Sequence, residues 1–283
     1  MNDGFLYIDK EATWSSRDIC NKIQSIFHTK KVGHIGTLDP FATGLLIVSV
    51  NKATKAGQFL ESLDKTYIAT LVLGEKRDGG DITGDILEYK KYKSYSEEYI
   101  KEVLSSFIGE ISQIPPMKSA VHYNGRKLYQ YDRENIVVNP PSRKVRVNSI
   151  ELLSYKDNEI SFITNVSKGT YIRVLGEDIA KRLDTVGYLS SLRRIKVGEL
   201  DISKAKKINE ISSDDFISIP DALENIKHVY IDEILEDKAK RGLRIFFKDI
   251  KDDNILLINK SGEAIAVYER YKDDEYHSLR GLF

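Results

Sequence analysis

The sequence predicts an α/β fold of the α+β type, in which a mixed, largely antiparallel sheet is flanked by helices and a small all-β module follows. Strand-like apolar runs alternate with helix-period stretches up to about residue 200. After residue 227 only short β-like runs separated by turn residues remain. A basic segment at about residues 115–147 opens with a Pro-Pro pair. We therefore expect a large domain over residues 1–226, with an insertion at about 115–147, and a small domain over residues 227–283.

The N-terminal part of the chain predicts a strand, a helix and a second strand. Phe5–Ile8 has the apolar run of a strand, and Ser15 with Asp18 three residues later is typical of a helix start. The helix would extend to Phe27, because its apolar residues share one helical face. The elements expected next are strand Leu45–Val50, a short helix over Lys52–Leu60, strand Tyr67–Leu73 and a polar turn cluster over residues 74–81.

The second half of the large domain predicts two helices around a β-hairpin. Ser96–Phe107 has a hydroxyl start, two early glutamates and one apolar stripe, which together predict an amphipathic helix. Thr170 is a candidate cap for a helix from Tyr171 to Leu183. The remaining elements are hairpin strands Val145–Tyr155 and Glu159–Val166, a strand-like run over residues 192–195, a linker with helical pieces over Ile208–Ile226, and β-like runs Ile255–Ile258 and Ala264–Tyr268.

Composition limits the kinds of protein this chain can be. With 283 residues, 41% hydrophobic and 30% charged, the chain is long enough for one large and one small globular domain. No apolar run approaches the roughly twenty residues of a membrane helix, and no signal-type segment opens the chain, so we expect a cytoplasmic protein without membrane contact. Cys20 is the only cysteine and the five histidines are widely spaced, so we expect neither a disulfide nor a metal site. A net charge of zero argues against indiscriminate coating of nucleic acid.

One carboxylate, Asp39, lies on a glycine-rich segment, Gly33–Gly44, that we expect to form a loop ahead of a buried strand. The ring of Pro40 disfavours the α region for Asp39, so the backbone that aims this carboxylate is restricted. The alternative is an ordinary turn in which Asp39 bonds its own backbone. The three glycines and two threonines of the segment exceed what a turn requires, and such a loop anchored to a core is a common place for catalytic groups.

The segment from Met117 to Val147 is strongly biased in charge. Its tyrosines at positions 123, 129 and 131 are interleaved with cations, which is typical of surfaces that neutralise phosphates and stack bases or sugars. A solvated charged face is the alternative. Two acidic residues, Asp132 and Glu134, oppose seven basic ones, namely Lys118, Arg126, Lys127, Arg133, Arg143, Lys144 and Arg146.

The run KVGHIGTLDPFATG over Lys31–Gly44 closely resembles the catalytic motif of the bacterial tRNA pseudouridine-55 synthases, the TruB branch of the pseudouridine synthases. Four further segments resemble this family in the same order, so the resemblance extends from the N-terminus to about residue 200. They are Ser62–Tyr67 (SLDKTY), Ile114–Ala120 (IPPMKSA), Ser167–Arg173 (SKGTYIR) and Tyr188–Arg194 (YLSSLRR). The small C-terminal domain resembles the PUA-like RNA-binding domain of the family in size and position, without a sharp motif.

The resemblance implies a catalytic set of Asp39, Tyr67 and Arg173. Tyr67 would lie against the target base, although a single tyrosine is more often an amphipathic core residue. Arg173 falls in the first turn of a predicted helix, where the macrodipole favours anions, so it is better placed beside a carboxylate; the family pairs this arginine with the catalytic aspartate. Leu192 matches an apolar residue that lines the uracil pocket of the family.

Substrate contacts are implied for residues outside this set. His34 matches the motif histidine that contacts the target loop, and Tyr171 belongs to the same motif as Arg173. Lys10 matches a family lysine, but Glu11 stands where the family usually has proline, which leaves the position of Lys10 open. The other expected contacts come from the acidic turn residue Asp81, for which a solvated turn is the alternative, and from Lys118, Arg126, Lys127 and Arg143 of the basic segment.

The implied reaction is the isomerisation of uridine to pseudouridine in the T-loop of tRNA, at position 55 of that RNA. It requires a flipped base, a carboxylate, an apolar and aromatic slot, and a cation that keeps the carboxylate ionised, and it requires no cofactor. The sequence leaves open whether Asp39 attacks the sugar, attacks the base or removes a sugar proton. We expect a monomer that binds the T-arm of tRNA without an obligatory protein partner.

Two other functions fit parts of the sequence. Gly33–Gly36 matches the GxxG loop with which KH domains clamp a nucleic-acid backbone, which would make the chain a non-catalytic RNA-binding module. A KH loop joins two helices, however, whereas these glycines lead into Leu-Asp-Pro and an apolar strand. The second alternative is a pseudouridine synthase that acts on another RNA.

Overall fold

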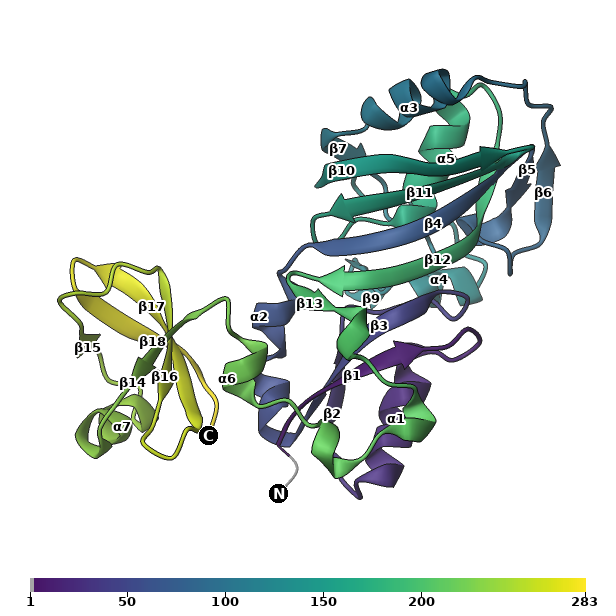
Figure 1. Cartoon of the computed structure of the whole chain (residues 1–283). Helices are drawn as coiled ribbons and strands as arrows, with labels where there is room; N and C mark the ends of the chain where they lie inside the picture. The colour runs from purple at the N-terminus through teal and green to yellow at the C-terminus, as the bar shows by residue number, and fades with distance from the viewer. Residues whose placement is uncertain (1–2) are drawn as a thin grey trace.

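The computed structural model describes residues 3–283, most of which belong to a nine-stranded sheet with helices or to a second, five-stranded sheet (Figure 1). The strands of the large sheet are β1 (Gly4–Lys10), β2 (Val32–Ile35), β3 (Thr43–Val50), β4 (Lys65–Leu73), β7 (Gly109–Gln113), β10 (Arg143–Lys156), β11 (Glu159–Val166), β12 (Gly187–Val197) and β13 (Leu200–Asp201). Their order is β1-β3-β12-β4-β11-β10-β7, with β2 beside β3 and β13 beside β12. Every pair is antiparallel except β3 with β12, which confirms the mixed, largely antiparallel sheet.

Helices cover the sheet, and serine side chains cap two of those that pack on it. Ser15 caps α1 (Ser16–Ile26) and forms a capping box with Asp18, as the sequence predicts. Ser96 caps α3 (Glu97–Ser105), which packs against β10, while α5 (Ile172–Arg182) packs against β12. Both helices contribute to one apolar cluster with the inner faces of β4 and β11. Among residues 3–283, no helix is long and apolar enough to span a bilayer.

Three local expectations differ from the structure. Residues 33–35 are not a loop but part of β2, because their backbone pairs with Ile47–Ser49 of β3. The helix expected over Lys52–Leu60 is divided into a 3-10 turn, Asn51–Lys55, and α2, Gly57–Glu61. Thr170 does not cap α5.

The cap of α5 comes from another strand. Tyr171 is the N-cap residue of this helix, and its amide donates to Oε1 of Gln113, the last residue of β7, at 3.0 Å. Thr170 instead donates its hydroxyl to the carbonyl of Ser167 at 2.9 Å. The expected cap was wrong because a buried amide side chain far away in sequence takes this role.

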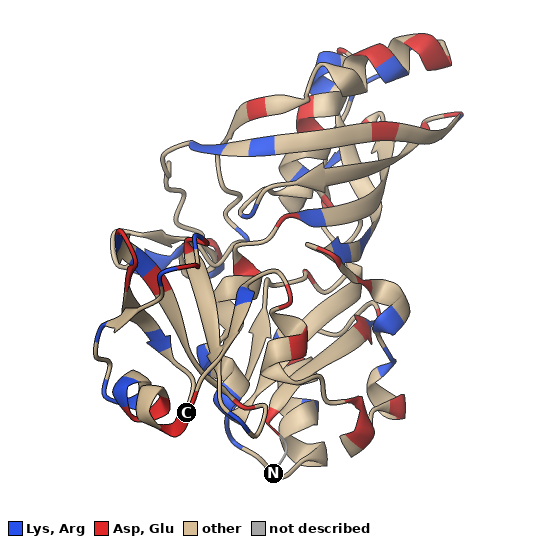
Figure 2. Cartoon of the chain, turned by 60° about the vertical axis from the view of Figure 1, so that its left-hand side comes forward, with Lys and Arg blue, Asp and Glu red and all other residues tan. Residues whose placement is uncertain are grey.

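The insertion forms a small subdomain beside the sheet. It contains strands β8 (His122–Tyr123) and β9 (Arg126–Lys127) and the short helix α4 (Leu128–Arg133). Another small hairpin, β5 (Glu75–Arg77) with β6 (Ile86–Tyr89), follows β4. Figure 2 shows basic and acidic positions interspersed along most of the ribbon, in line with the zero net charge.

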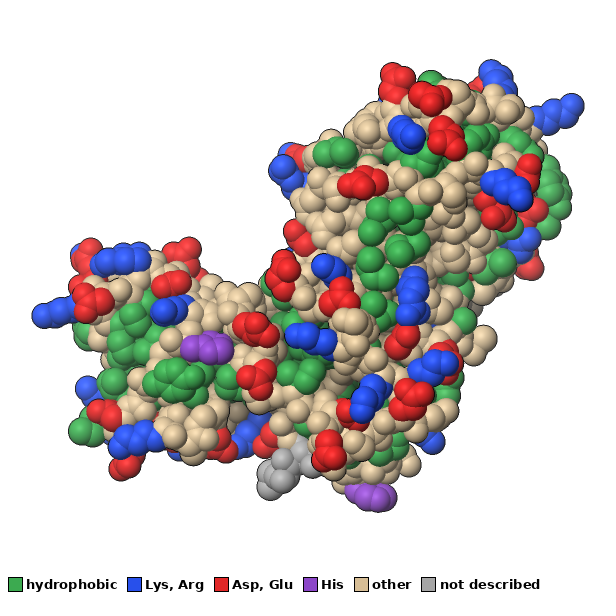
Figure 3. All heavy atoms as spheres, in the orientation of Figure 1, with side chains coloured by type: hydrophobic (Ala, Val, Ile, Leu, Met, Phe, Trp, Pro, Cys, Tyr) green, Lys and Arg blue, Asp and Glu red, His purple; other side chains and the backbone are tan. Residues whose placement is uncertain are grey.

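The C-terminal sheet packs against the large domain. The linker between the two sheets contains 3-10 turns Ile202–Lys204, Ile208–Glu210 and Ser213–Asp215 and the short helix α6 (Ile219–Ala222). The small sheet has the order β14-β16-β17-β18-β15, and helix α7 (Glu233–Lys240) accompanies it. Figure 3 shows this module as a lobe that stands at an open angle to the upper part of the large sheet. Its strands are β14 (Lys227–Tyr230), β15 (Ile245–Phe246), β16 (Asn254–Ile258), β17 (Ala264–Lys272) and β18 (Glu275–Gly281).

Candidate active site

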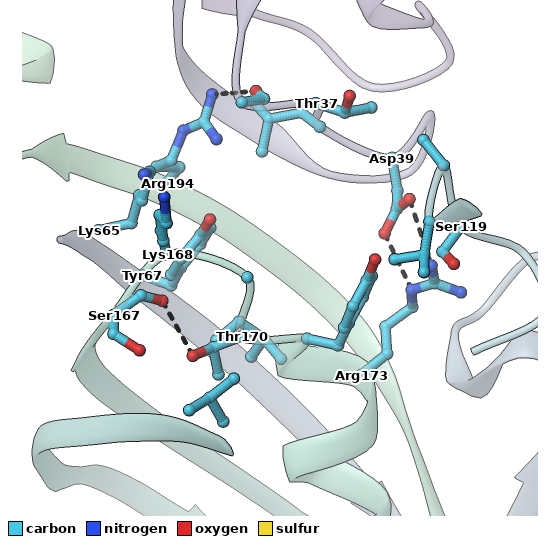
Figure 4. Close-up of a pocket in the computed structure, with 18 of the residues that line it drawn as sticks. Thr37, Asp39, Lys65, Tyr67, Ser119, Ser167, Lys168, Thr170, Arg173 and Arg194 are labelled. Carbon is cyan, nitrogen blue, oxygen red and sulfur yellow. Dashed lines mark hydrogen bonds and ion pairs between the residues drawn. The ribbon is translucent and has the colours of Figure 1, made fainter. Parts of the chain in front are cut away.

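A cavity of about 730 Å³ lies between the segment after β2, the strands β4 and β12, and the insertion. That volume is in the range of small-molecule and cofactor pockets. Residues from five regions far apart in sequence line it, which Figure 4 shows for the labelled side chains. The large sheet is the frame that brings these regions together, since β4 and β12 are adjacent strands at its centre.

Asp39 and Arg173 form the central polar contact of this cavity. Arg173 Nε lies 2.9 Å from Asp39 Oδ2, and Nη2 donates to Asp39 Oδ1 at 3.3 Å. The same guanidinium donates to the carbonyls of Gly79, at 2.6 Å, and Lys118, at 3.1 Å. Its Nη1 also lies 3.6 Å from Asp81 Oδ2. The two-point contact fixes the orientation of the carboxylate as well as its charge environment.

The loop that carries Asp39 is held by side chains of the N-terminal region. The hydroxyl of Ser16 accepts from the amide of Leu38 at 2.9 Å and donates to the carbonyl of the same residue at 3.0 Å. The buried Lys10 ammonium donates to the carbonyls of Trp14, at 2.7 Å, and Pro40, at 3.3 Å. Lys10 thus ties β1 to Pro40, the residue after Asp39. It makes this contact although Glu11 stands where the family usually has proline.

Burial and charge act in opposite directions on the titrating groups here. Burial raises the pKa of the Asp39 carboxyl, with a further contribution from the neighbouring charge of Asp81, while the guanidinium of Arg173 and the ammonium of Lys10 oppose the rise. Burial also lowers the pKa of Lys10 to about 8, against the attraction of Asp39. The guanidinium of Arg173 is therefore the largest influence that favours the ionised form of Asp39.

Tyr67 and Leu192 form an aromatic and apolar wall of the cavity. They lie on adjacent antiparallel strands, where Tyr67 pairs with Arg194 and Ala69 pairs with Leu192. Both side chains are largely buried, with exposed fractions of 9% for Tyr67 and 6% for Leu192. Tyr171 lines the cavity from the start of α5. This wall offers a surface for a flat, apolar-faced group such as a base.

The predicted contact residues divide into two groups. Tyr171, Lys118 and Arg143 line the cavity. The Lys118 ammonium is engaged with Asp78 at 2.6 Å. Asp81 lies outside the lining but contacts Arg173, which lines the cavity, and Lys10 contacts Pro40, the residue after the lining residue Asp39. The other residues outside the lining are His34 on β2 and Arg126 and Lys127 on β9.

His34, Asp81 and Arg126 have distinct surroundings. The His34 Nδ1 atom is buried without a hydrogen-bond partner among the described residues, and burial lowers the pKa of this imidazole. Oδ1 of Asp81 accepts from the amide and the hydroxyl of Thr83, so this carboxylate is not a freely solvated turn residue. Arg126 contacts Glu134 and lies over the ring of Tyr131 at 4.6 Å.

Lys65 and Arg194 line the cavity and were missed by sequence reasoning. A signal for them exists, because side chains two positions apart on a strand share a face. Lys65 is two residues before Tyr67 on β4, and Arg194 is two residues after Leu192 on β12. The described residues contain no group of three or more His, Cys, Asp or Glu side chains that could hold a metal ion.

Comparison with known proteins identifies the family. A family model described as "TruB family pseudouridylate synthase (N terminal domain)" matches residues 24–172. The chain belongs to the TruB family of pseudouridine synthases. One TruB-family relative, "tRNA pseudouridine synthase B" of Mesoplasma florum, is 35% identical over 98% of this chain and 97% of its own length. A protein of the same name from Francisella tularensis is 38% identical over 85% of this chain and 83% of its own length.

Solved structures agree with the TruB-family fold. A chain of a structure titled "Structure of H/ACA RNP bound to a substrate RNA containing 2'-deoxyuridine" aligns with all of this chain and 86% of its own at a TM-score of 0.75 and 20% identity. A chain of "Crystal Structure of a Cbf5-Nop10-Gar1 Complex" aligns at the same TM-score and 22% identity. The KH alternative is not favoured, because Gly33 lies in β2 and the next regular element described after Gly36 is the strand β3 rather than a helix.

Proposed function

We propose that this chain converts uridine to pseudouridine at position 55 in the T-loop of tRNA, in the cytoplasm, with Asp39 as the reacting carboxylate. The observation that carries the proposal is the two-point contact between Arg173 and Asp39 at a cavity walled by Tyr67 and Leu192. Names of relatives at 35% and 38% identity support tRNA as the substrate.

The reaction breaks the bond between C1′ of the ribose and N1 of uracil and forms one between C1′ and C5. The proton on C5 leaves and N1 gains a proton, so no redox change occurs. Attack by Asp39 on the sugar, attack on the base, or removal of a sugar proton each requires an ionised carboxylate. Arg173 favours the ionised form. Tyr67 and Leu192 shield the detached uracil from water and keep it from diffusing out of the cavity.

We assign the remaining predicted residues to RNA binding. Lys118 and Arg143 at the cavity wall, with Arg126 and Lys127 further along the insertion, neutralise phosphates. Tyr171, His34, Lys10 and Asp81 shape the site or hold its loops.

The proposed division of labour follows the two sheets. Residues 1–226 contain every residue of the cavity, so the reaction belongs to them. Residues 227–283 form the PUA-like RNA-binding domain and expose the aromatic side chains of Tyr230, Phe246 and Tyr271. We propose a monomer that needs no protein partner. Size-exclusion chromatography with light scattering, with and without tRNA, tests this.

The central test replaces Asp39 by Asn, which keeps the side-chain volume and removes the charge. We expect single-turnover conversion to fall by about a thousandfold or more, with tRNA affinity nearly unchanged. Asp157→Asn is the matched control, because it removes the same charge from a hairpin turn with φ of 55°, a conformation that suits Asn. Turnover of Asp39→Asn within tenfold of wild type would show that Asp39 is a structural turn residue.

The substrate assignment has its own test. The pure protein is incubated with unmodified tRNA, and pseudouridine is mapped at nucleotide resolution. We expect one product site, in the T-loop. A product elsewhere would overturn the substrate assignment, and tight binding without any product would favour a non-catalytic RNA-binding protein.

A further inference from the structure

Cations without carboxylate partners gather at the end of the cavity opposite Asp39. Figure 4 shows Lys65, Lys168 and Arg194 on one side of Tyr67 and the contact between Asp39 and Arg173 on the other. Lys65 is 6% exposed and Arg194 is fully buried. Within residues 3–283, the hydrogen bonds of these two side chains go to main-chain carbonyls, and neither is ion-paired.

The main chain holds both cations in place and leaves donors free. The Lys65 ammonium donates to the carbonyls of Glu61 and Leu63, which uses two of its three protons. Arg194 donates from Nε to the carbonyl of Leu45 at 2.7 Å and from Nη2 to that of Gly36 at 2.9 Å. Its Nη1 has no hydrogen-bond partner among the described residues.

Gly36 leaves room beside this last nitrogen. Its φ is +68°, and a Cβ atom at this position would lie 3.1 Å from Arg194 Nη1. Any side chain here would therefore crowd that end of the buried guanidinium. The glycine thus keeps side-chain atoms away from Nη1 where Arg194 lines the cavity.

Two desolvated cations side by side need a compensating anion. Burial, together with the neighbouring charge of Arg194, lowers the pKa of Lys65 to about 8. Glu61 and Asp64 act in the opposite direction but form no ion pair with it, and Asp64 already accepts from Asn148 at 2.8 Å. A ligand that carries negative charge would relieve the repulsion and use the free protons.

We propose that Lys65 and Arg194 bind the RNA phosphate next to the flipped uridine, with Lys168 at the rim. This rests on the proposed function. Lys65 and Tyr67 are two positions apart on β4, about 7 Å along one face, and Arg194 lies opposite Tyr67. A phosphate bound there lies within one nucleotide of a base held against Tyr67. The site thus fixes the backbone on one side of the target while Asp39 acts on its glycosidic bond.

Neutral phosphates provide the test. Three T-arm stem-loop RNAs are compared: one with natural phosphates, and two with a methylphosphonate on the 5′ or the 3′ side of the target uridine. We expect wild-type protein to bind one of the two modified RNAs about tenfold more weakly, as expected for the loss of a charge-assisted contact. Lys65→Gln should bind the natural RNA about tenfold more weakly than wild type does. The methylphosphonate that weakens wild-type binding should lower the affinity of this variant little further.

Lys156→Gln is the matched control, since it removes an exposed charge from the end of β10 remote from the cavity. The methylphosphonate should weaken RNA binding by Lys156→Gln as much as it weakens binding by wild type. Lys65→Arg should restore part of the affinity that Lys65→Gln loses. The proposal would be overturned if Lys65→Gln and the methylphosphonate lowered the affinity for RNA independently, so that their fold-changes multiply. It would also be overturned if wild-type protein bound both modified RNAs as tightly as the natural one, a comparison that needs no variant to fold.

Two further readings separate the alternatives. Inorganic phosphate that competes with RNA at constant ionic strength, while both methylphosphonate RNAs bind normally, would assign the site to free phosphate and reject the RNA contact. Turnover of the natural RNA is measured in parallel. If the natural RNA is converted but the effects of Lys65→Gln and of the methylphosphonate are independent, this site alone is rejected. If the two effects are coupled but no RNA is converted, the proposed reaction is rejected and the site is kept.

Discussion

Arg173 is the residue on which the charge state of Asp39 depends. It is 4% exposed, it contacts Asp39 at two points, and it holds the carbonyls of Gly79 and Lys118. Burial alone raises the pKa of the Asp39 carboxyl, and Arg173 is the largest opposing influence. The same side chain therefore links the charge of Asp39 to the position of the insertion, through the carbonyl of Lys118.

We expect Arg173→Met to shift the acid limb of the pH profile of kcat/KM. Without the guanidinium, the pKa of Asp39 rises further, so its carboxylate is protonated at a higher pH and, as the solution is acidified, activity is lost at a higher pH than in wild type. Arg182→Met is the control, because it removes a cation from the last turn of the same helix. An unchanged acid limb in Arg173→Met would show that Asp39 does not set it.

At the scale of elements, the parallel pairing of β3 with β12 in the large sheet places the loop of Asp39. β3 meets β12 where Gly44 pairs with Arg194 and Thr43 with Arg193. The φ of Gly44 is +100°, and a Cβ atom there would lie 2.2 Å from the Arg194 carbonyl oxygen. Only glycine allows these two strands to approach so closely.

Gly44→Ala should therefore destabilise the fold by about 2 kcal/mol or more and reduce activity, because the strands must separate. Gly33→Ala is the matched control on β2, where an added Cβ atom would meet only the Ser49 hydroxyl, at 3.4 Å. Urea unfolding of both variants measures the difference. Equal stability of the two variants would contradict the close approach.

The strand β10 connects the insertion to the cavity and carries basic residues at that end. Arg143 lines the cavity, whereas Lys156 lies at the other end of the same strand. If Arg143 neutralises a phosphate, Arg143→Gln should flatten the slope of log affinity for tRNA against log salt by about 0.7–0.9, and Lys156→Gln should leave it unchanged. Equal slopes in all three proteins would show that this end of the strand is a solvated face.

At the scale of the whole molecule, the two sheets share one apolar cluster. Leu256, Val267 and Leu282 of the C-terminal module pack with Phe5 and Leu45 of the large domain in this cluster. The small module is therefore part of the packing that supports β1 and β3 rather than an appendage on a linker.

Leu282→Ala should lower the stability of the large domain as well as the small one. We expect a loss of about 2–5 kcal/mol, whereas Leu279→Ala, at a position 42% exposed, should change stability by about 0.5 kcal/mol or less. Trp14, the only tryptophan, packs against the core of the large domain and reports its unfolding by fluorescence. A Trp14 transition unaffected by Leu282→Ala would show that the two domains unfold independently.

The sequence by itself determined most elements and the central chemical group. Periodicity placed β1, α1, α3 and the β10–β11 hairpin, since each depends on which side chains lie two, three or four positions apart. The sequence also singled out Asp39, because the restriction that Pro40 places on the backbone of the preceding residue is local. Motif resemblance added Tyr67, Arg173 and Leu192, which the structure places around one cavity.

Only the tertiary structure decided contacts between residues distant in sequence. Arg173 meets Asp39 across 134 positions, and Arg194 meets Gly36 across 158. Strand order, the pairing of β2 and the cap that Gln113 provides for α5 arise the same way. Local propensity cannot report such pairs, because their free energy comes from burial and hydrogen bonding that exist only after the sheet has formed. Lys65 and Arg194 line the same cavity for the same reason: two cations on different strands come together only once β4 lies beside β12.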